Sequence, residues 1–240
     1  MSGKPDASFA EWSSRVELHP LEPFLPPNAR LLMLGSFPPP RKRWSMDFFY
    51  PNMQNDMWRI FGLSFYADKD YFIDAATHRF DRERIVQFLT QKGIALYDMA
   101  TSVCRLKENA SDRFLEVVEA TDLSLLLRHL TQCRAVVTTG QKATELLSEQ
   151  LGLSLLPKVG SFVDVERENG DMLRVYRMPS SSRAYPLPLE KKTAFYVSMF
   201  MDLFGELLFL IHWMIPLTKV TAIVPKATRN IAVNMNRIIR

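Results

Sequence analysis

Residues 31–38, LLMLGSFP, combine a short run of apolar side chains with a closing glycine and a loop that contains proline. An apolar run without polar interruptions is typical of a strand that is covered on both faces. Strands of this kind lie in the middle of a sheet that has helices on either side. The run therefore predicts a buried central strand that ends at Gly35, followed by a loop at its carboxyl end.

Helical and strand-like patterns alternate after this strand. Ile85, Phe88 and Leu89 recur at helical spacing, and Gly93 separates them from a second apolar run at residues 94–97. Alternation of helices with buried strands favours an α/β fold with a mostly parallel sheet and helices on both faces.

The same alternation continues in the second half of the chain. Thr121 is expected to cap a helix with a leucine stripe, and residues 135–138 form the next apolar run. That run ends at Gly140, and another helical stripe begins at Ala143.

A hairpin and a long helix are predicted after these elements. Residues 162–166 and 172–177 are strand-like, and the Asn-Gly pair at 169–170 supplies the positive backbone angles of a tight turn. An amphipathic helix is predicted from Leu189 onward.

The composition is that of an ordinary globular protein. Of the 240 residues, 47% are apolar and 23% are charged, which excludes disorder throughout the chain. The net charge of +4 permits a polyanionic partner but is far from that of a histone-like binder. The two cysteines, Cys104 and Cys133, argue against a disulfide framework and against a site with four thiolate ligands.

Three segments are expected along the chain. Residues 1–28 are rich in proline and are interpreted as a loosely docked lead-in, residues 29–205 as the folded domain, and residues 206–240 as an extension of unknown role. The N-terminus has no apolar core of a signal peptide, so we expect a cytoplasmic protein. His212 and Pro216 interrupt the apolar tail, which favours a docking helix over a membrane span.

Candidate ligand-binding residues lie in segments that follow predicted strands. They are residues 35–44, which include a basic triplet, residues 48–58, and residues 178–183. Ligands in an open parallel sheet bind beyond the carboxyl ends of the strands. Each segment also has a purely structural alternative. Residues 35–44 could be a rigid proline turn, residues 48–58 could hold core aromatic side chains and a helix-capping Asn55, and residues 178–183 could be an ordinary serine turn. No GxSxG, HExxH or P-loop motif is present, so serine-triad, zinc-protease and P-loop chemistry lack their usual residues.

Several short motifs occur in a fixed order along the chain. They are Gly35-Ser36-Phe37-Pro38, an aromatic pair followed by Pro51, Gln54-Asn55-Asp56-Met57-Trp58-Arg59, Gly93-Ile94-Ala95-Leu96-Tyr97-Asp98, and Pro179-Ser180-Ser181-Ser182. In this order the motifs resemble those of the uracil-DNA glycosylase superfamily, most closely its hypoxanthine-DNA and mismatch-specific branches. The resemblance covers residues 29–205 as a glycosylase-like domain. It implies a three-layer α/β/α sandwich around a mostly parallel four-stranded sheet.

The resemblance also implies a role for each motif. A base flipped out of DNA would lie against Gly35, Ser36, Phe37 and Pro38. Tyr50 would stack on the base, and Asn55 would be the catalytic residue. The minor groove would be entered by a loop made of Pro179, Ser180, Ser181, Ser182 and Arg183. Phosphate contacts, which weaken with salt, are expected from Arg41, Lys42, Arg43, Lys142 and Arg183.

Two positions depart from the family pattern. Many relatives carry a catalytic Asn or Asp where this chain has Phe37, and the uracil-specific enzyme has a histidine where this chain has Met178. The water-positioning role is therefore expected to fall on Asn55. Its amide has no useful proton affinity at neutral pH, so strong general-base catalysis is not expected.

The leading hypothesis is a monofunctional, monomeric DNA glycosylase that removes hypoxanthine or uracil from DNA without a metal or cofactor. One alternative is a nucleic-acid-binding relative that has lost catalysis, which the apolar Phe37 and Met178 favour. A weaker alternative is a membrane-associated α/β hydrolase, which rests on the apolar tail.

Overall fold

The larger sheet of the protein has four parallel strands and one antiparallel strand. The structure is a computed structural model that describes residues 16–107, 112–167 and 169–205. The sheet has the strand order β3 (Ile94–Asp98), β2 (Leu31–Gly35), β6 (Ala135–Thr139), β8 (Met172–Met178) and β7 (Ser161–Glu166). The first four strands are parallel, and β7 pairs antiparallel with β8. The predicted four parallel strands are therefore present, and the first arm of the predicted hairpin adds a fifth strand at the edge.

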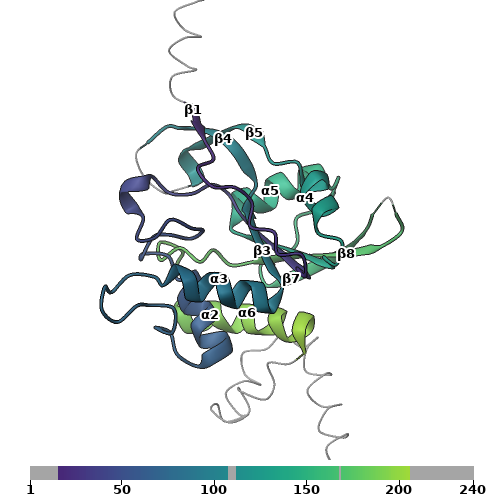
Figure 1. Ribbon diagram of the computed structural model, residues 1–240. Helices are drawn as coiled ribbons and strands as arrows, with labels where there is room; N and C mark the ends of the chain where they lie inside the picture. The colour runs from purple at the N-terminus through teal and green to yellow at the C-terminus, as the bar shows by residue number, and fades with distance from the viewer. Residues whose placement is uncertain (1–15, 108–111, 168, 206–240) are drawn as a thin grey trace, which may run out of the picture.

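Helices cover both faces of this sheet. Those described are α2 (Met57–Tyr66), α3 (Arg82–Lys92), α4 (Leu123–His129), α5 (Gln141–Gln150) and α6 (Leu189–Phe204). In Figure 1, α2, α3 and α6 lie below the sheet and α4 and α5 lie above it. Every residue of β2, β3 and β6 is buried, which is why their sequences are continuous apolar runs. The arrangement is the predicted α/β class in three layers.

The cap of α4 differs from the prediction. Asp122, and not Thr121, caps the helix, because its carboxylate accepts a hydrogen bond of 3.0 Å from the Leu125 N–H. The Thr121 side chain is buried, and its hydroxyl donates to the Asp98 carbonyl oxygen at 2.7 Å. The predicted capping role of Thr121 is therefore wrong, since its hydroxyl bonds to the last residue of β3 and not to the helix.

A smaller antiparallel sheet, which the sequence pattern does not predict, adjoins the first. Its strands are β1 (Val16–Leu18), β4 (Ala100–Arg105) and β5 (Leu115–Ala120), in the order β1-β4-β5. Phe24 also forms an isolated bridge with Leu96 of β3. Residues 16–28 are thus attached to both sheets, so the prediction of a loosely docked lead-in is wrong for them. Residues 1–15 lie outside the described part of the chain.

Two hydrophobic cores fill the fold. The main core lies on both faces of the larger sheet, and a small second core consists of Ala100, Val103 and Leu115 with Phe37 and Val117 packed against it. Within the described ranges, no helix has the length and apolar character needed to cross a membrane. The C-terminal extension at 206–240 lies outside these ranges, and the docking helix expected there stays a prediction.

Candidate functional site

Loops that follow neighbouring strands begin at one edge of the larger sheet. β2 ends at Gly35 opposite Asp98, the last residue of β3. β6 ends at Thr139 opposite Met178, the last residue of β8. This carboxyl edge is where ligands of open parallel sheets bind. The segments predicted as a site after β2 and after β8 therefore start at the same edge.

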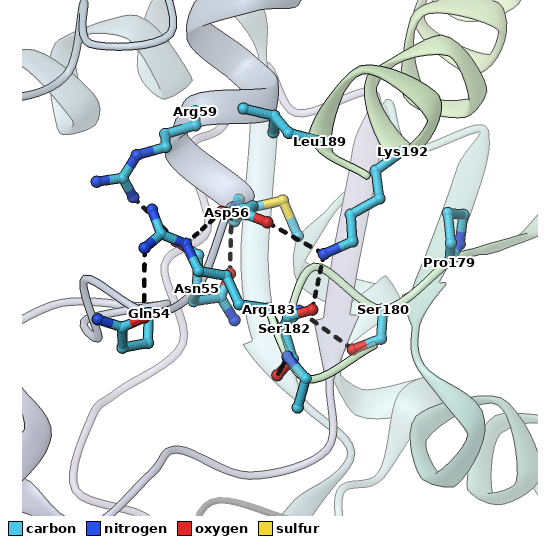
Figure 2. A network of polar contacts seen from close by, with 12 residues as sticks. Gln54, Asn55, Asp56, Arg59, Pro179, Ser180, Ser182, Arg183, Leu189 and Lys192 are labelled. Atoms are coloured by element: carbon cyan, nitrogen blue, oxygen red, sulfur yellow. Dashed lines mark hydrogen bonds and ion pairs between the residues drawn. The ribbon is translucent and has the colours of Figure 1, made fainter. Parts of the chain in front are cut away.

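Asn55 lies beside the late loop, residues 179–183. It forms an isolated antiparallel bridge with Ser182. The next backbone N–H, that of Asp56, donates to the Ser181 carbonyl oxygen at 2.8 Å. Figure 2 shows Asn55 and the late loop next to each other. The structure thus brings together two predicted site segments that are far apart in the sequence.

The Asn55 side chain makes one hydrogen bond within the described residues. Its Oδ1 accepts a hydrogen bond of 2.9 Å from the Met57 N–H, the first backbone amide of α2, although the N-cap position itself is occupied by Asp56. A carbonyl oxygen has a second lone pair. Within the described residues, the Asn55 Nδ2 group has no hydrogen-bond partner. An acceptor position and both amide N–H groups therefore remain for a ligand.

Tyr50 is held between β6 and α2. Its hydroxyl and that of Thr139 share a hydrogen bond of 3.2 Å, and its ring meets the Trp58 ring edge to face at a centroid distance of 6.1 Å. The Tyr50 φ angle of 48° lies in the left-handed region, which costs about 1–3 kcal/mol outside glycine. Burial raises the pKa of Tyr50, and the charge of Asp98 raises it further. The hydroxyl therefore stays neutral at physiological pH.

The first loop, residues 35–38, is packed against both sheets. A Cβ at Gly35 would collide with Asp98 Oδ1, so a larger residue at the end of β2 would require the Asp98 carboxylate to move. Phe37 packs against the second core, and its ring centroid lies 5.4 Å from that of His19. An apolar side chain at this position is thus explained by packing against the smaller sheet.

A cavity of about 280 Å³ borders the first loop. Its lining consists of Glu17, Leu18, Pro20, Phe37, Pro38, Pro39, Pro40, Arg41 and Trp44. Tyr50 and Asn55 do not belong to this lining. The cavity therefore lies on the side of the first loop that faces β1, and it is not the predicted base pocket.

Three ionisable side chains at this edge were not predicted as site residues. His19 Nε2 lies 3.0 Å from Asp98 Oδ2, and both side chains are buried. The Ser36 hydroxyl donates to Asp112 Oδ1 at 2.6 Å. Asp98 is the last residue of the motif at 93–98, and this position is the sequence feature from which it could have been predicted as a site residue. No local pattern marks His19 or Asp112, because only the smaller sheet and its connections bring them to the first loop.

The basic residues predicted to bind phosphate lie in two different surroundings. Arg41, Lys42 and Arg43 form the exposed 3-10 helix η1 (Arg41–Arg43). Arg41 pairs with Asp47 at 2.6 Å, and its guanidinium lies 4.1 Å from the Trp44 ring centroid. Arg183 is instead bound to Asp56 at the late loop. The role of the η1 residues and of Lys142 in DNA binding stays a prediction.

Asp112 leads to a prediction about stability and pH. Burial raises the pKa of Asp112, and the Ser36 hydrogen bond opposes this only in part. A carboxyl group with a higher pKa in the folded chain binds its proton more tightly there, so the charged form destabilises the fold as pH rises through the unfolded and folded pKa values. We expect Asp112→Asn to raise the Tm at about pH 7, and the gain to shrink toward the unfolded pKa of about 4.

Asp164 is the matched control for this experiment. Its hydrogen bond to Arg174 lowers the pKa of Asp164, so its charged form stabilises the fold. Asp164→Asn should therefore lower the Tm at neutral pH, with an effect that fades in acid. Thermal unfolding between about pH 4 and pH 7, followed by circular dichroism, measures the Tm of both variants. A lower Tm of Asp112→Asn at neutral pH would contradict the prediction.

Of the residues that the structure describes, no group of three or more His, Cys, Asp or Glu is placed to hold a metal ion.

Comparisons with known proteins identify the fold. No known family model matches the sequence, and no curated protein matches it. The chain is similar to the solution NMR structure of a "putative Uracil DNA glycosylase" from Methanosarcina acetivorans, with 21% identity and a TM-score of 0.52 over 76% of this chain and 95% of that chain. The protein therefore shares the α/β fold of that structure.

Proposed function

We propose that the protein is a monofunctional DNA glycosylase of the uracil-DNA glycosylase superfamily. It would hydrolyse the N-glycosidic bond of a deaminated base, hypoxanthine or uracil, flipped out of DNA. The observation that carries the proposal is the pairing of Asn55 with Ser182, which sets an amide side chain beside the late loop. The fold shared with the structure of a "putative Uracil DNA glycosylase" supports the same class of reaction. We further propose that the protein acts as a monomer in the cytoplasm.

The reaction requires the base to leave the duplex. Flipping costs a few kcal/mol and is easiest for mismatched or damaged pairs, so the step itself favours lesions. An aromatic ring offers the flipped base about 1–3 kcal/mol of stacking, whatever the base. Tyr50 is proposed for this role, since it is half-buried and fixed by Thr139 at the sheet edge.

Cleavage develops positive charge on the sugar and negative charge on the base. Fixed dipoles that face these charges stabilise the transition state without reorganising. The second lone pair of Asn55 Oδ1 would face the sugar and orient the attacking water, while α2 fixes the side chain through the Met57 N–H. Backbone N–H groups of the first loop would meet the oxygen of the departing base.

The late loop would enter the minor groove and fill the gap that the flipped base leaves. Ser180 and Ser182 are partly exposed and would face the groove, and Arg183 is the exposed charge at the end of the loop. Pro179 and Ser181 are buried and would support the loop from within the fold. Contacts to phosphate from Arg183 and from η1 would make DNA binding weaken with salt.

A panel of labelled duplexes tests the proposed function. The duplexes contain deoxyinosine, uracil or neither, and each is incubated with the protein and then treated with alkali. We expect breaks only in lesion duplexes and only after alkali, because a monofunctional glycosylase leaves an abasic site and an intact strand. A panel without any lesion-dependent break would contradict the proposal.

One observation favours a second candidate, a DNA-binding protein without catalysis. The position that carries a catalytic polar group in many relatives is Phe37, and it is filled by packing against the smaller sheet. Met178, at the end of β8, is also apolar and buried. The duplex panel distinguishes the two candidates, because retention of lesion duplexes in a gel shift without alkali-sensitive breaks would identify the binding protein.

The stacking role of Tyr50 is tested by a pair of variants. Tyr50→Ala removes the ring, whereas Tyr50→Phe removes only the hydroxyl that bonds Thr139. We expect Tyr50→Ala to weaken binding of a lesion duplex by roughly 5- to 150-fold, the equivalent of about 1–3 kcal/mol, and Tyr50→Phe to keep most of the affinity. Fluorescence anisotropy gives both dissociation constants.

Two controls accompany this measurement. Affinity for an undamaged duplex should change little, because no base stacks on the ring there. Tyr71→Ala removes another aromatic ring, one that stacks on Tyr66, and should leave lesion binding unchanged. Equal affinities of Tyr50→Ala and the wild type for lesion DNA would exclude the stacking role.

A further inference from the structure

A buried ion pair lies behind the proposed site. Lys192 Nζ on α6 lies 3.1 Å from Asp56 Oδ2, and the two side chains are only 1% and 7% exposed. Lys192 Nζ also donates to the Ser182 carbonyl oxygen at 2.7 Å. Fully buried lysines are rare unless they are paired. The lysine is thus an internal part of the fold, although its neighbour Lys191 is exposed.

Asp56 connects this lysine to a second cation. Its Oδ1 accepts a hydrogen bond of 2.9 Å from Arg183 Nε, and Arg183 Nη1 donates to Gln54 Oε1 at 3.3 Å. Figure 2 shows Lys192 and Arg183 approaching the Asp56 carboxylate from two sides. One carboxylate therefore joins the start of α2, the late loop and α6.

The network fixes the two segments that carry the proposed chemistry. Asn55 directly precedes Asp56 in the chain, and Ser182, the bridge partner of Asn55, accepts from Lys192. A backbone hydrogen bond of 3.2 Å from the Arg183 N–H to the Gln54 carbonyl oxygen runs parallel to these contacts. Lys192 bonds to Asp56 and Ser182 and is covered by protein, so it would act on a bound base only through them.

We propose that Lys192 is a positioning residue of the glycosylase, which holds Asn55 at a fixed place relative to the late loop through Asp56 and Ser182. This inference rests on the proposed function, because it assigns Lys192 to the reaction that Asn55 performs. A displacement of about 1 Å in a catalytic group lowers a rate by up to roughly 10²-fold. Loss of the lysine should therefore slow excision while leaving DNA binding intact.

The test combines kinetics with amide hydrogen exchange. Lys192→Met keeps the length of the side chain and removes its charge. We expect its single-turnover excision rate at saturating enzyme to fall about 10-fold or more, with an unchanged dissociation constant for the lesion duplex. By NMR, exchange of the Asp56 and Arg183 amide protons should accelerate, because these N–H groups cross between the two segments.

Two matched variants separate this effect from a general loss of charge or stability. Lys191→Met removes an exposed charge next to Lys192 and should leave the rate and the exchange unchanged. Arg174→Met removes ion pairs to Asp164 and Asp202 and should lower the Tm without slowing excision by folded protein.

A double variant covers the case in which Lys192→Met does not fold. Lys192→Met with Asp56→Asn leaves no buried carboxylate that has lost its lysine partner, so we expect it to fold. If Lys192 is a positioning residue, the excision rate of the double variant stays low, although its Tm recovers relative to Lys192→Met. A rate that recovers together with the Tm would show a purely structural contact and overturn the inference.

The outcomes distinguish this inference from the proposed function. A wild-type protein that excises no base contradicts the function, and the exchange comparison then shows by itself whether Lys192 holds the two segments together. Unchanged exchange in Lys192→Met would overturn the inference even in an active enzyme. Faster exchange with a wild-type excision rate would overturn it as well, because the position of Asn55 would then not depend on Lys192.

Discussion

Asn55→Ala is expected to abolish the alkali-sensitive breaks in lesion duplexes while DNA retention in a gel shift persists. The substitution removes the proposed dipole that faces the sugar and the water, and loss of one such preorganised group lowers a rate by roughly 10²- to 10³-fold. Binding should persist because the stacking ring of Tyr50 and the late loop are unchanged. Single-turnover excision at saturating enzyme gives the rate, and the gel shift gives the affinity.

The hydrogen bond of Asn55 to α2 has to be separated from its proposed catalytic role. Asn55 Oδ1 accepts from the Met57 N–H, so Asn55→Ala also destabilises the start of α2 by about 1 kcal/mol, the usual net contribution of one hydrogen bond. Asn55→Ser keeps an oxygen that can accept from this N–H, and we expect it to recover the Tm but not the excision rate. Asn52→Ala is the matched control, because Asn52 Oδ1 accepts from the Gln54 N–H in the same loop. Full activity of Asn55→Ser or of Asn55→Ala would remove the catalytic assignment.

The larger sheet was predictable because its central strands are covered on both faces. Burial of every residue in β2, β3 and β6 requires continuous apolar runs, and these can be recognised without knowing the partners. The smaller sheet gives no such signal. β5 carries Glu116 and Glu119 and is mostly exposed, and β1 has only three residues. Pairing across long stretches of chain, which sequence patterns do not contain, defines these strands.

The same distinction applies to the candidate site. Asn55 and the late loop could be proposed because each stands in a local motif that follows a predicted strand or precedes a helix. Lys192 could not, because its partner Asp56 is 136 residues away and a lysine on an amphipathic helix is normally read as exposed. His19 was missed for a similar reason, since the smaller sheet brings it to Asp98 across 79 residues.

Trp58→Ala is expected to cause the largest loss of stability among the residues near the site. Trp58 is 1% exposed, and its indole N–H donates to the Phe49 carbonyl oxygen at 3.2 Å. Removing a buried tryptophan side chain costs about 3–5 kcal/mol, because the apolar contacts are lost and a cavity remains. That is a large part of the roughly 5–15 kcal/mol by which domains are stable. Urea unfolding followed by fluorescence or circular dichroism measures the change.

Trp44→Ala is the matched control for this loss. Its indole N–H also donates to a backbone carbonyl oxygen, that of Pro39 at 2.7 Å, but the side chain is half-buried and leaves no closed cavity. We expect a cost of about 1 kcal/mol, the usual net contribution of one hydrogen bond. Equal losses for the two variants would show that Trp58 is not a core anchor. Trp58→Ala should also disturb the site, because it removes the hydrogen bond to Phe49. Phe49 directly precedes Tyr50, whose strained backbone depends on the neighbours that hold it.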